Sequence, residues 1–140
     1  ARSACEAAGL DAAVQEVIRQ CQSGEPRRNR CISATGAHGL VTAASDATFR
    51  ETLDGFYWNL PDGMPGVWIG RLKGAAQMNR CYGPDFFRLV FERSAHLPIR
   101  HFLCGGQEGV AGQLKTAVGQ KFGNYNVVGT YCPPFRDLSD

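Results

Sequence analysis

The chain has 140 residues, of which 44% are hydrophobic and 20% are charged. This composition is typical of a folded protein and not of a disordered one, and the length fits a single domain over residues 1–140. The formal net charge of +2 is too small to indicate binding to nucleic acid, and no apolar run approaches the roughly 20 residues that span a bilayer.

The predicted elements alternate along the chain. Apolar residues at helical spacing predict the first helix, and glycine or proline turns separate the later elements. The expected helices cover residues 10–21, 45–53, 67–72, 83–95 and 110–122, and the expected strands cover residues 31–34, 56–60, 99–104 and 127–131. Such alternation favours parallel pairing through right-handed crossovers. We therefore predict an α/β fold, namely a Rossmann-like, open, mostly parallel sheet with helices on both faces.

The six cysteines show no Cys-x-x-Cys pair and no Cys/His grouping at zinc spacing. Several have apolar neighbours, as Cys104 does after Phe102 and Leu103. We expect mostly buried, reduced thiols in a cytoplasmic protein, with a disulfide or a reactive thiol as the alternatives. No metal site is expected, and His96 and His101 are interpreted as structural or exposed.

Ligands of open parallel sheets bind beyond the carboxyl ends of the strands, so the turns there are the places to look for function. Three such turns cover residues 34–39, 61–63 and 105–110. In the last of them, Gly105, Gly106 and Gln107 precede a predicted helix, whose N-terminal N–H groups suit phosphate. The turn lacks the GxGxxG spacing, and a tight strand-to-helix turn is the alternative interpretation.

Asp62 lies between Pro61 and Gly63 on a constrained turn. An aspartate is ionised at neutral pH and can accept a proton from a hydroxyl, although a role in stabilising its own turn is equally compatible with the sequence. Arg80 could clamp a phosphate or be an ordinary surface arginine. His38 is a candidate polar contact in the first turn.

Five segments together resemble the WecG/TagA/CpsF glycosyltransferase family. They are TGAHGLV (35–41), LPDGMP (60–65), RCYGPD (80–85), FLCGGQEGVA (102–111) and VGTY (128–131). The resemblance runs from about Leu10 to Phe135. It implies inverting transfer of an N-acetylhexosamine-type sugar, N-acetylmannosamine or a related one, from a UDP donor to a lipid-diphosphate-linked acceptor in cell-surface polysaccharide synthesis. It implies no cofactor and no essential metal.

The resemblance also implies roles for individual residues. Asp62 corresponds to the base that deprotonates the acceptor hydroxyl, and Arg80 to an arginine beside the diphosphate. The donor contacts would come from the first and third turns, through Thr35, Gly36, His38, Gly105, Gly106 and Gln107. Where many members have Thr and Asn in the first turn, this sequence has Ala34 and Gly36.

The family continues beyond the last motif with an arginine-bearing tail that completes the site. We therefore expect these 140 residues to be the N-terminal part of a longer protein that contacts the inner face of the cytoplasmic membrane peripherally. We expect the part to fold alone, to lack turnover alone, and to self-associate through exposed apolar surface. A nucleotide-binding module without catalysis is the alternative. An unrelated NAD enzyme is disfavoured because the dinucleotide fingerprint is absent.

Overall fold

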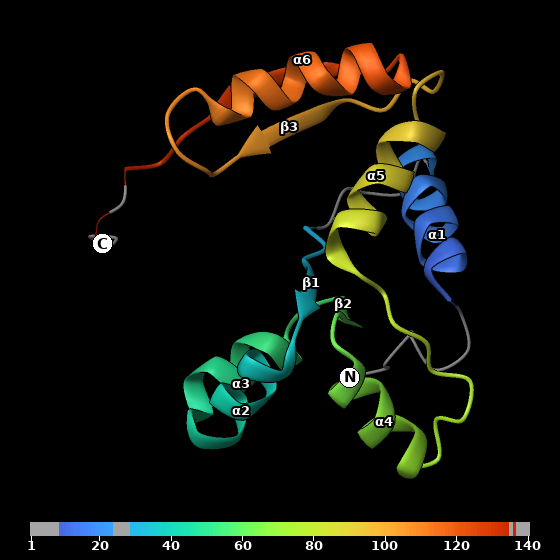
Figure 1. The fold of residues 1–140 in the computed structure, drawn as a ribbon, viewed down its shortest axis with the longest axis vertical. Coiled ribbons are helices and arrows are strands. Elements are labelled where there is room, and N and C mark those ends of the chain that lie inside the picture. The colour runs from blue at the N-terminus through green and yellow to red at the C-terminus, as the bar shows by residue number, and fades with distance from the viewer. Residues whose placement is uncertain (1–8, 24–28, 135, 137–140) are drawn as a thin grey trace. The chain divides into compact units, whose positions relative to one another are not determined.

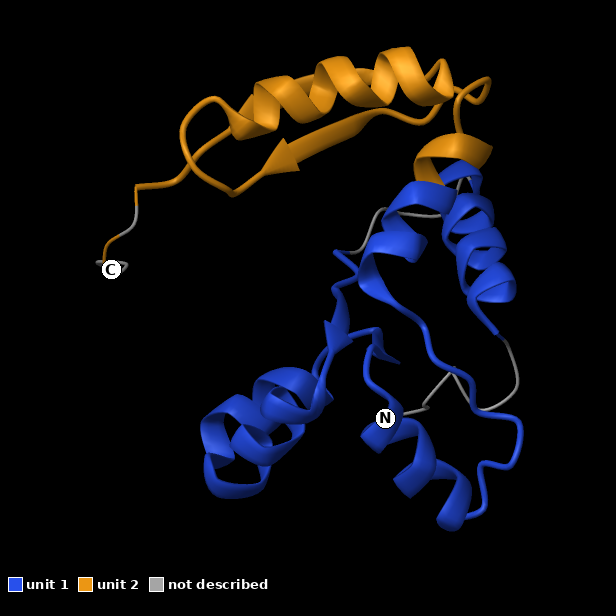
Figure 2. Cartoon of the chain, viewed as in Figure 1, with its two compact units in different colours: residues 1–89 blue, residues 90–140 orange. Residues whose placement is uncertain are grey.

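The computed structural model describes residues 9–23, 29–134 and 136. It divides into two compact units, residues 1–89 and 90–140, which Figure 2 colours separately. The boundary falls inside one helix, between Leu89 and Val90. The single domain over residues 1–140 stays a prediction.

Unit 1 contains a two-stranded parallel sheet, sheet A, formed by β1 (Ile32–Thr35) and β2 (Trp58–Pro61). Ile32 pairs with Trp58 and Thr35 with Pro61, so both strands end at one edge. The helices of this unit are α1 (Leu10–Gln22), α2 (Ala37–Ser45), α3 (Ala47–Asp54), α4 (Met64–Leu72) and the first part of α5 (Gly83–Arg93).

The core of unit 1 lies between α1 and sheet A. Ala13, Trp58, Leu60 and Cys81 are buried together, and the partly buried Leu10, Val17, Ile32 and Phe86 pack against them. Ala13 and Val17 lie four positions apart in α1, so they share one helical face. The apolar periodicity that predicted this helix therefore marks the face that covers the sheet.

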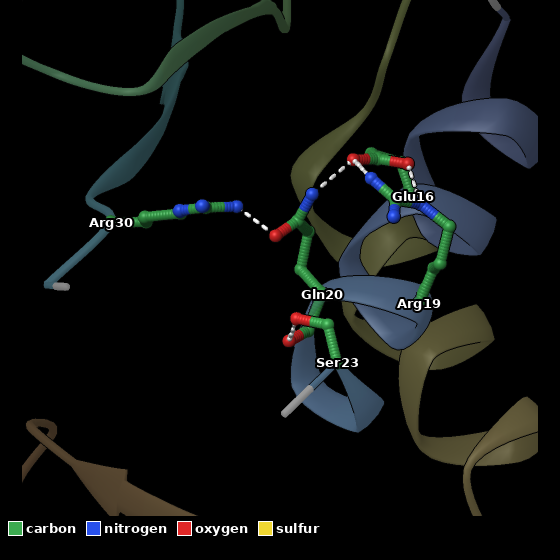
Figure 3. Close-up of polar contacts among 5 residues, drawn as sticks. All are labelled: Glu16, Arg19, Gln20, Ser23 and Arg30. Carbon is green, nitrogen blue, oxygen red and sulfur yellow. Dashed lines mark hydrogen bonds and ion pairs between the residues drawn. The ribbon is translucent and has the colours of Figure 1, made fainter. Parts of the chain in front are cut away.

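The outer face of α1 carries a polar cluster (Figure 3). The Glu16 carboxylate accepts hydrogen bonds from Arg19 Nε at 2.6 Å and from Gln20 Nε2 at 2.6 Å, and Gln20 Oε1 accepts one from Arg30. The hydrogen bonds from Arg19 and then Gln20 lower the pKa of Glu16 to about 2. The cluster links α1 to the segment that leads into β1.

Unit 2 pairs β3 (His101–Cys104) with β4 (Val127–Tyr131) in a second parallel sheet, sheet B. The helix α6 (Val110–Phe122) connects these strands and packs along them (Figure 1). The buried apolar side chains of this unit are Phe91, Ile99, Leu103, Ala111, Val118 and Val127. The arrangement is a single strand–helix–strand crossover with its own small core.

A buried polar network also stabilises unit 2. Asn124 and Ser94 are fully buried. Asn124 Nδ2 donates to the Phe91 carbonyl at 2.8 Å and to Ser94 Oγ at 3.1 Å. Ser94 Oγ also lies 2.9 Å from Nε2 of His101, whose pKa is lowered by burial. Because each of these buried polar groups has a hydrogen-bond partner, the cost of desolvating them is offset, and the network holds the end of α5 against sheet B.

The fold type agrees with the sequence-based prediction, whereas the arrangement of the strands in sheets differs from it. The elements are mixed α and β and the strands are parallel, as predicted. The described residues form two sheets of two strands each, so the predicted single open sheet is not shown. The predicted elements are all found with ends within three residues, and α2 is an additional helix that the sequence analysis missed.

The expectation of mostly buried cysteines is wrong for the part of the chain that the structure describes. Cys21, Cys31 and Cys104 are exposed, Cys132 is half-buried, and Cys81 is buried. Cys104 follows the buried Leu103 in β3, and successive strand residues point to opposite faces. Because Leu103 points to the buried face of the strand, the thiol of Cys104 points to the exposed face. Cys5 lies outside the described residues.

Candidate active site at the carboxyl edge of sheet A

Two helices begin where the strands of sheet A end. Gly36 follows β1 and is the N-cap of α2, and Gly63 follows β2 by two positions and is the N-cap of α4. A Cβ on Gly63 would lie 3.7 Å from the backbone nitrogen of Ala37, so the two helix starts are neighbours. The N–H groups in the first turn of a helix have no partner within that helix, so this edge carries a positive potential.

Asp62 lies between these helix starts. Its backbone N–H donates to the Thr35 carbonyl at 3.2 Å and continues the pairing of the two strands. Its side chain is half-buried, and Oδ1 accepts a hydrogen bond from the backbone N–H of Gly83 at 2.9 Å. Gly83 is the first residue of α5, so the carboxylate caps a third helix.

The close approach of α5 to β1 favours a glycine at position 83. A Cβ on Gly83 would lie 3.2 Å from the Cβ of Ala34 and 4.0 Å from Oδ1 of Asp62. The small side chain of Ala34 and the absence of one at Gly83 therefore bring the N-terminus of α5 to Asp62. Ala34, a departure from the usual first turn, thus has a packing role.

Arg80 lies beside Asp62. Its Nε donates to the backbone carbonyl of Asp62 at 2.6 Å, and its guanidinium carbon lies 4.3 Å from the centre of the Tyr82 ring. The side chain is exposed, and within the described part of the chain its Nη groups have no hydrogen-bond partner. The guanidinium is thus oriented by two contacts and keeps donors that can bind an anion.

Thr35 and His38, the other predicted side chains of unit 1, lie in different environments. Thr35 Oγ1 lies 2.6 Å from Ser33 Oγ, which donates to Asn59 Oδ1 at 2.6 Å. This row of polar side chains follows one face of sheet A, and the sequence analysis missed Asn59. The parallel pairing of Ser33 with Asn59 is the signal that could have found it. His38 is exposed in the first turn of α2.

The glycine turn belongs to unit 2. Gly105 and Gly106 follow β3 with φ of 114° and 78°, values at which a side chain is strained. The Gly105 N–H donates to the Tyr131 carbonyl at 2.9 Å, and the Gln107 carbonyl accepts from Val110 N at 3.1 Å. Gly109, with φ of 82°, is the N-cap of α6. The turn therefore places exposed backbone at a helix N-terminus, as predicted.

Cys132 lies beside this turn, and the sequence did not indicate it as a site residue. Its thiol donates to the Gly106 carbonyl at 3.1 Å.

The predicted site residues fall in both units. The structure brings Thr35, Gly36, Asp62 and Arg80 together in unit 1, and it places Gly105, Gly106 and Gln107 in unit 2. Among the described residues, no group of three or more His, Cys, Asp or Glu side chains could hold a metal ion.

A carboxylate, an oriented arginine and neighbouring helix N-termini are groups that suit transfer from a phosphate-bearing donor, which places the chain among candidate transferases. The family model of the glycosyl transferase WecG/TagA/CpsF family matches residues 3–140. The chain belongs to this family and is a glycosyltransferase of cell-surface polysaccharide synthesis. A comparison with curated proteins gives no significant match. None of the described helices has the length and apolar character needed to cross a membrane.

Proposed function

We propose that this glycosyltransferase transfers an N-acetylhexosamine-type sugar, N-acetylmannosamine or a related one, from a UDP donor to a lipid-diphosphate-linked acceptor. The proposal places the reaction at the cytoplasmic face of the membrane. The observation that supports it best is Asp62, a carboxylate at the edge of sheet A with one oxygen bonded to Gly83 and with Arg80 beside it. Family membership supplies the reaction class.

In the proposed reaction, Asp62 takes the proton of the acceptor hydroxyl. The hydroxyl oxygen attacks the anomeric carbon of the donor sugar, the bond from that carbon to the UDP oxygen breaks, and the configuration inverts. Oδ1 is held by the Gly83 N–H, so Oδ2 is the oxygen left to accept the proton. A positioned general base contributes roughly 10²- to 10⁴-fold to such a step.

Negative charge develops on the UDP diphosphate as it leaves. We assign its stabilisation to Arg80 and to the N–H groups at the starts of α2 and α4, which supply positive charge without a metal ion. Thr35, Gly36 and His38 are the proposed donor contacts at the same edge. In unit 2, the N–H groups of Gly106 and Gln107 are the proposed contacts to the nucleotide, and Gly105, whose N–H donates to the Tyr131 carbonyl, is proposed to shape the turn. The proposal needs no cofactor.

Release of UDP from the sugar donor by the natural full-length protein, in the presence of a lipid-diphosphate acceptor analogue, tests the proposal. Asp62→Asn keeps an oxygen that can accept from the Gly83 N–H and removes the base, so turnover should fall by at least about 100-fold. Calorimetry with UDP should give the same affinity for both proteins. An unchanged turnover for Asp62→Asn would show that the base is misassigned.

The second candidate function is a nucleotide-binding module without catalysis. It is supported by the glycine turn, whose three positive-φ glycines stand at the start of α6 independently of Asp62. UDP binding without turnover by the natural full-length protein would favour it, and UDP binding that Gly105→Ala and Gly106→Ala leave unchanged would count against it.

A further inference from the structure

The segment that carries Arg80 is attached to α4 immediately before this arginine. Arg71, in the last turn of α4, donates from Nε to the Met78 carbonyl at 2.9 Å and from Nη2 to Asn79 Oδ1 at 3.0 Å. Both acceptors belong to the two residues that precede Arg80. A guanidinium is planar and donates in a fixed fork, so two bonds from one side chain define the position of residues 78–79 more narrowly than one bond would.

The amide of Asn79 is itself held in one orientation. Its Nδ2 donates to the Gln77 carbonyl at 3.1 Å, so Oδ1 is the atom that faces Arg71. An amide rotated by half a turn would place its oxygen against the Gln77 carbonyl and its NH2 group against the Arg71 guanidinium, and both contacts would be repulsive. The attachment therefore depends on the asparagine as well as on the arginine.

Burial alone does not fix the segment between α4 and Arg80. Of residues 73–77, all but Ala75 are exposed, and Gly74 has φ of 102°. The first side chain that packs closely is Met78, which is half-buried beside Gly70, where a Cβ would collide with the Met78 sulfur. An exposed segment with few packed side chains opens easily, so the bonds from Arg71 carry much of its order.

The chain is attached again directly after Arg80. The backbone N–H of Cys81 donates to the Pro61 carbonyl at 2.9 Å, and Nε of Arg80 donates to the Asp62 carbonyl at 2.6 Å. Arg80 thus lies between two attachments, one to the end of α4 through Arg71 and one to the edge of sheet A. Loss of the first would let residues 73–80 move, and the Nη groups of Arg80 would sample more positions.

We propose that Arg71 is a positioning residue for Arg80, and that its bonds to Met78 and Asn79 hold the Arg80 guanidinium where it binds the diphosphate of the sugar donor. This inference rests on the proposed function. Arg80 contacts the diphosphate, whereas Arg71 acts only through residues 78–80. Because a fixed segment loses less conformational entropy when the anion binds, Arg71 raises the affinity for the donor without touching it.

Calorimetry with UDP on the natural full-length protein tests the proposal. Arg71→Ala should weaken UDP binding by about threefold to fivefold, and Arg71→Lys, which keeps the charge without the fork, by less. Asn79→Ala should weaken it as Arg71→Ala does, and the two changes together should be no worse than either alone. Lys73→Ala is the matched control, because it removes an equal, exposed charge two positions further along the chain and should leave UDP affinity unchanged.

The double variant Arg71→Ala/Arg80→Gln distinguishes positioning from direct contact. If Arg71 acts through Arg80, adding Arg71→Ala to Arg80→Gln should leave UDP affinity where Arg80→Gln puts it. An additive loss would show that Arg71 attracts the ligand by its own charge and would overturn the proposal. Uridine, which has no phosphate, should bind Arg71→Ala and the unsubstituted protein equally. An equal loss for uridine and UDP would assign Arg71 to the fold alone.

Hydrogen exchange gives a readout that does not depend on the ligand. The amides of residues 78–81 should exchange faster in Arg71→Ala, whereas those of α6 in unit 2 should not change. Unchanged UDP affinity in Arg71→Ala, together with a loss in Arg80→Gln, would overturn this inference and leave the proposed function standing. Unchanged affinity in Arg80→Gln would overturn the diphosphate contact, and the positioning role with it.

Discussion

The carboxylate of Asp62 and the backbone N–H of Gly83 form a 2.9 Å hydrogen bond across 21 residues of sequence. This bond joins the turn after β2 to the first residue of α5. It holds one carboxylate oxygen in place at a helix N-terminus, where a negative charge is stabilised. Gly83 is thus a positioning residue for the proposed base, and its missing side chain is what allows the contact.

Gly83→Ala should lower turnover. The new Cβ would lie 3.2 Å from Ala34 Cβ, so we expect the start of α5 and β1 to separate by a few tenths of an ångström, which lengthens the hydrogen bond to Asp62. We expect kcat/KM to fall by about tenfold, the size of one weakened charge-assisted hydrogen bond.

The double variant Ala34→Gly/Gly83→Ala is the control for that substitution. It keeps one Cβ at the contact instead of two and should recover most of the lost kcat/KM. If the double variant is as slow as Gly83→Ala, a clash with Ala34 is not the cause.

Arg80→Gln should weaken UDP binding by about tenfold and turnover by more, because charge on the diphosphate is greatest as it leaves. Arg80→Lys keeps the charge but loses the Nε bond to the Asp62 carbonyl and should give an intermediate result. Calorimetry with UDP and a UDP-release assay measure the two effects. Arg50→Gln, an exposed arginine of α3 in the same unit, should match the unsubstituted chain in both.

Gly106→Ala should destabilise the fold by about 1–2 kcal/mol, because φ is 78° and L residues are strained there. The change would also distort the proposed nucleotide contact, so UDP affinity should fall. Gly112→Ala is its matched control: it lies inside α6 with nothing within 4 Å of the new Cβ. That variant should gain up to about 1 kcal/mol of stability. If thermal unfolding showed that Gly106→Ala and Gly112→Ala change Tm in the same direction, backbone strain at position 106 would not be the cause.

The sequence predicted best the elements whose ends have strong local signals. For α6 and β4 the predicted and observed bounds agree, because Gly109 and Gly123 flank α6 with positive φ. The helix α2 was missed because Gly36 and Gly39 were interpreted as a turn. A Cβ on Gly39 would lie 2.9 Å from Thr35 Cγ2, so this glycine serves close packing of the helix start on β1.

The parts that depend on distant residues could not be predicted. The motifs predict Asp62 and Arg80 as site residues, and Pro84 and Asp85 correctly predict the start of α5. No local signal predicts the hydrogen bond from Gly83, because Asp62 accepts it from a remote turn. Strand pairing is likewise non-local, and alternation of elements could not distinguish one sheet from the two observed.

Unit 2 should lose stability as the pH falls below about 6.5, the ordinary pKa of histidine. Burial lowers the pKa of His101 in the folded state, so between its lowered pKa and about 6.5 the unfolded chain binds the extra proton. Acid therefore favours unfolding in this window, and stability is recovered as the pH rises through it. Ser94 Oγ lies 2.9 Å from Nε2 of His101.

His101→Gln keeps a side chain that can form a hydrogen bond to Ser94 Oγ and removes the titrating ring. Thermal unfolding between pH 7.5 and 5 should show a shallower pH dependence for this variant, whereas His96→Gln, at an exposed position, should behave as the unsubstituted chain. Equal slopes for His101→Gln and the unsubstituted chain would show that another group is responsible.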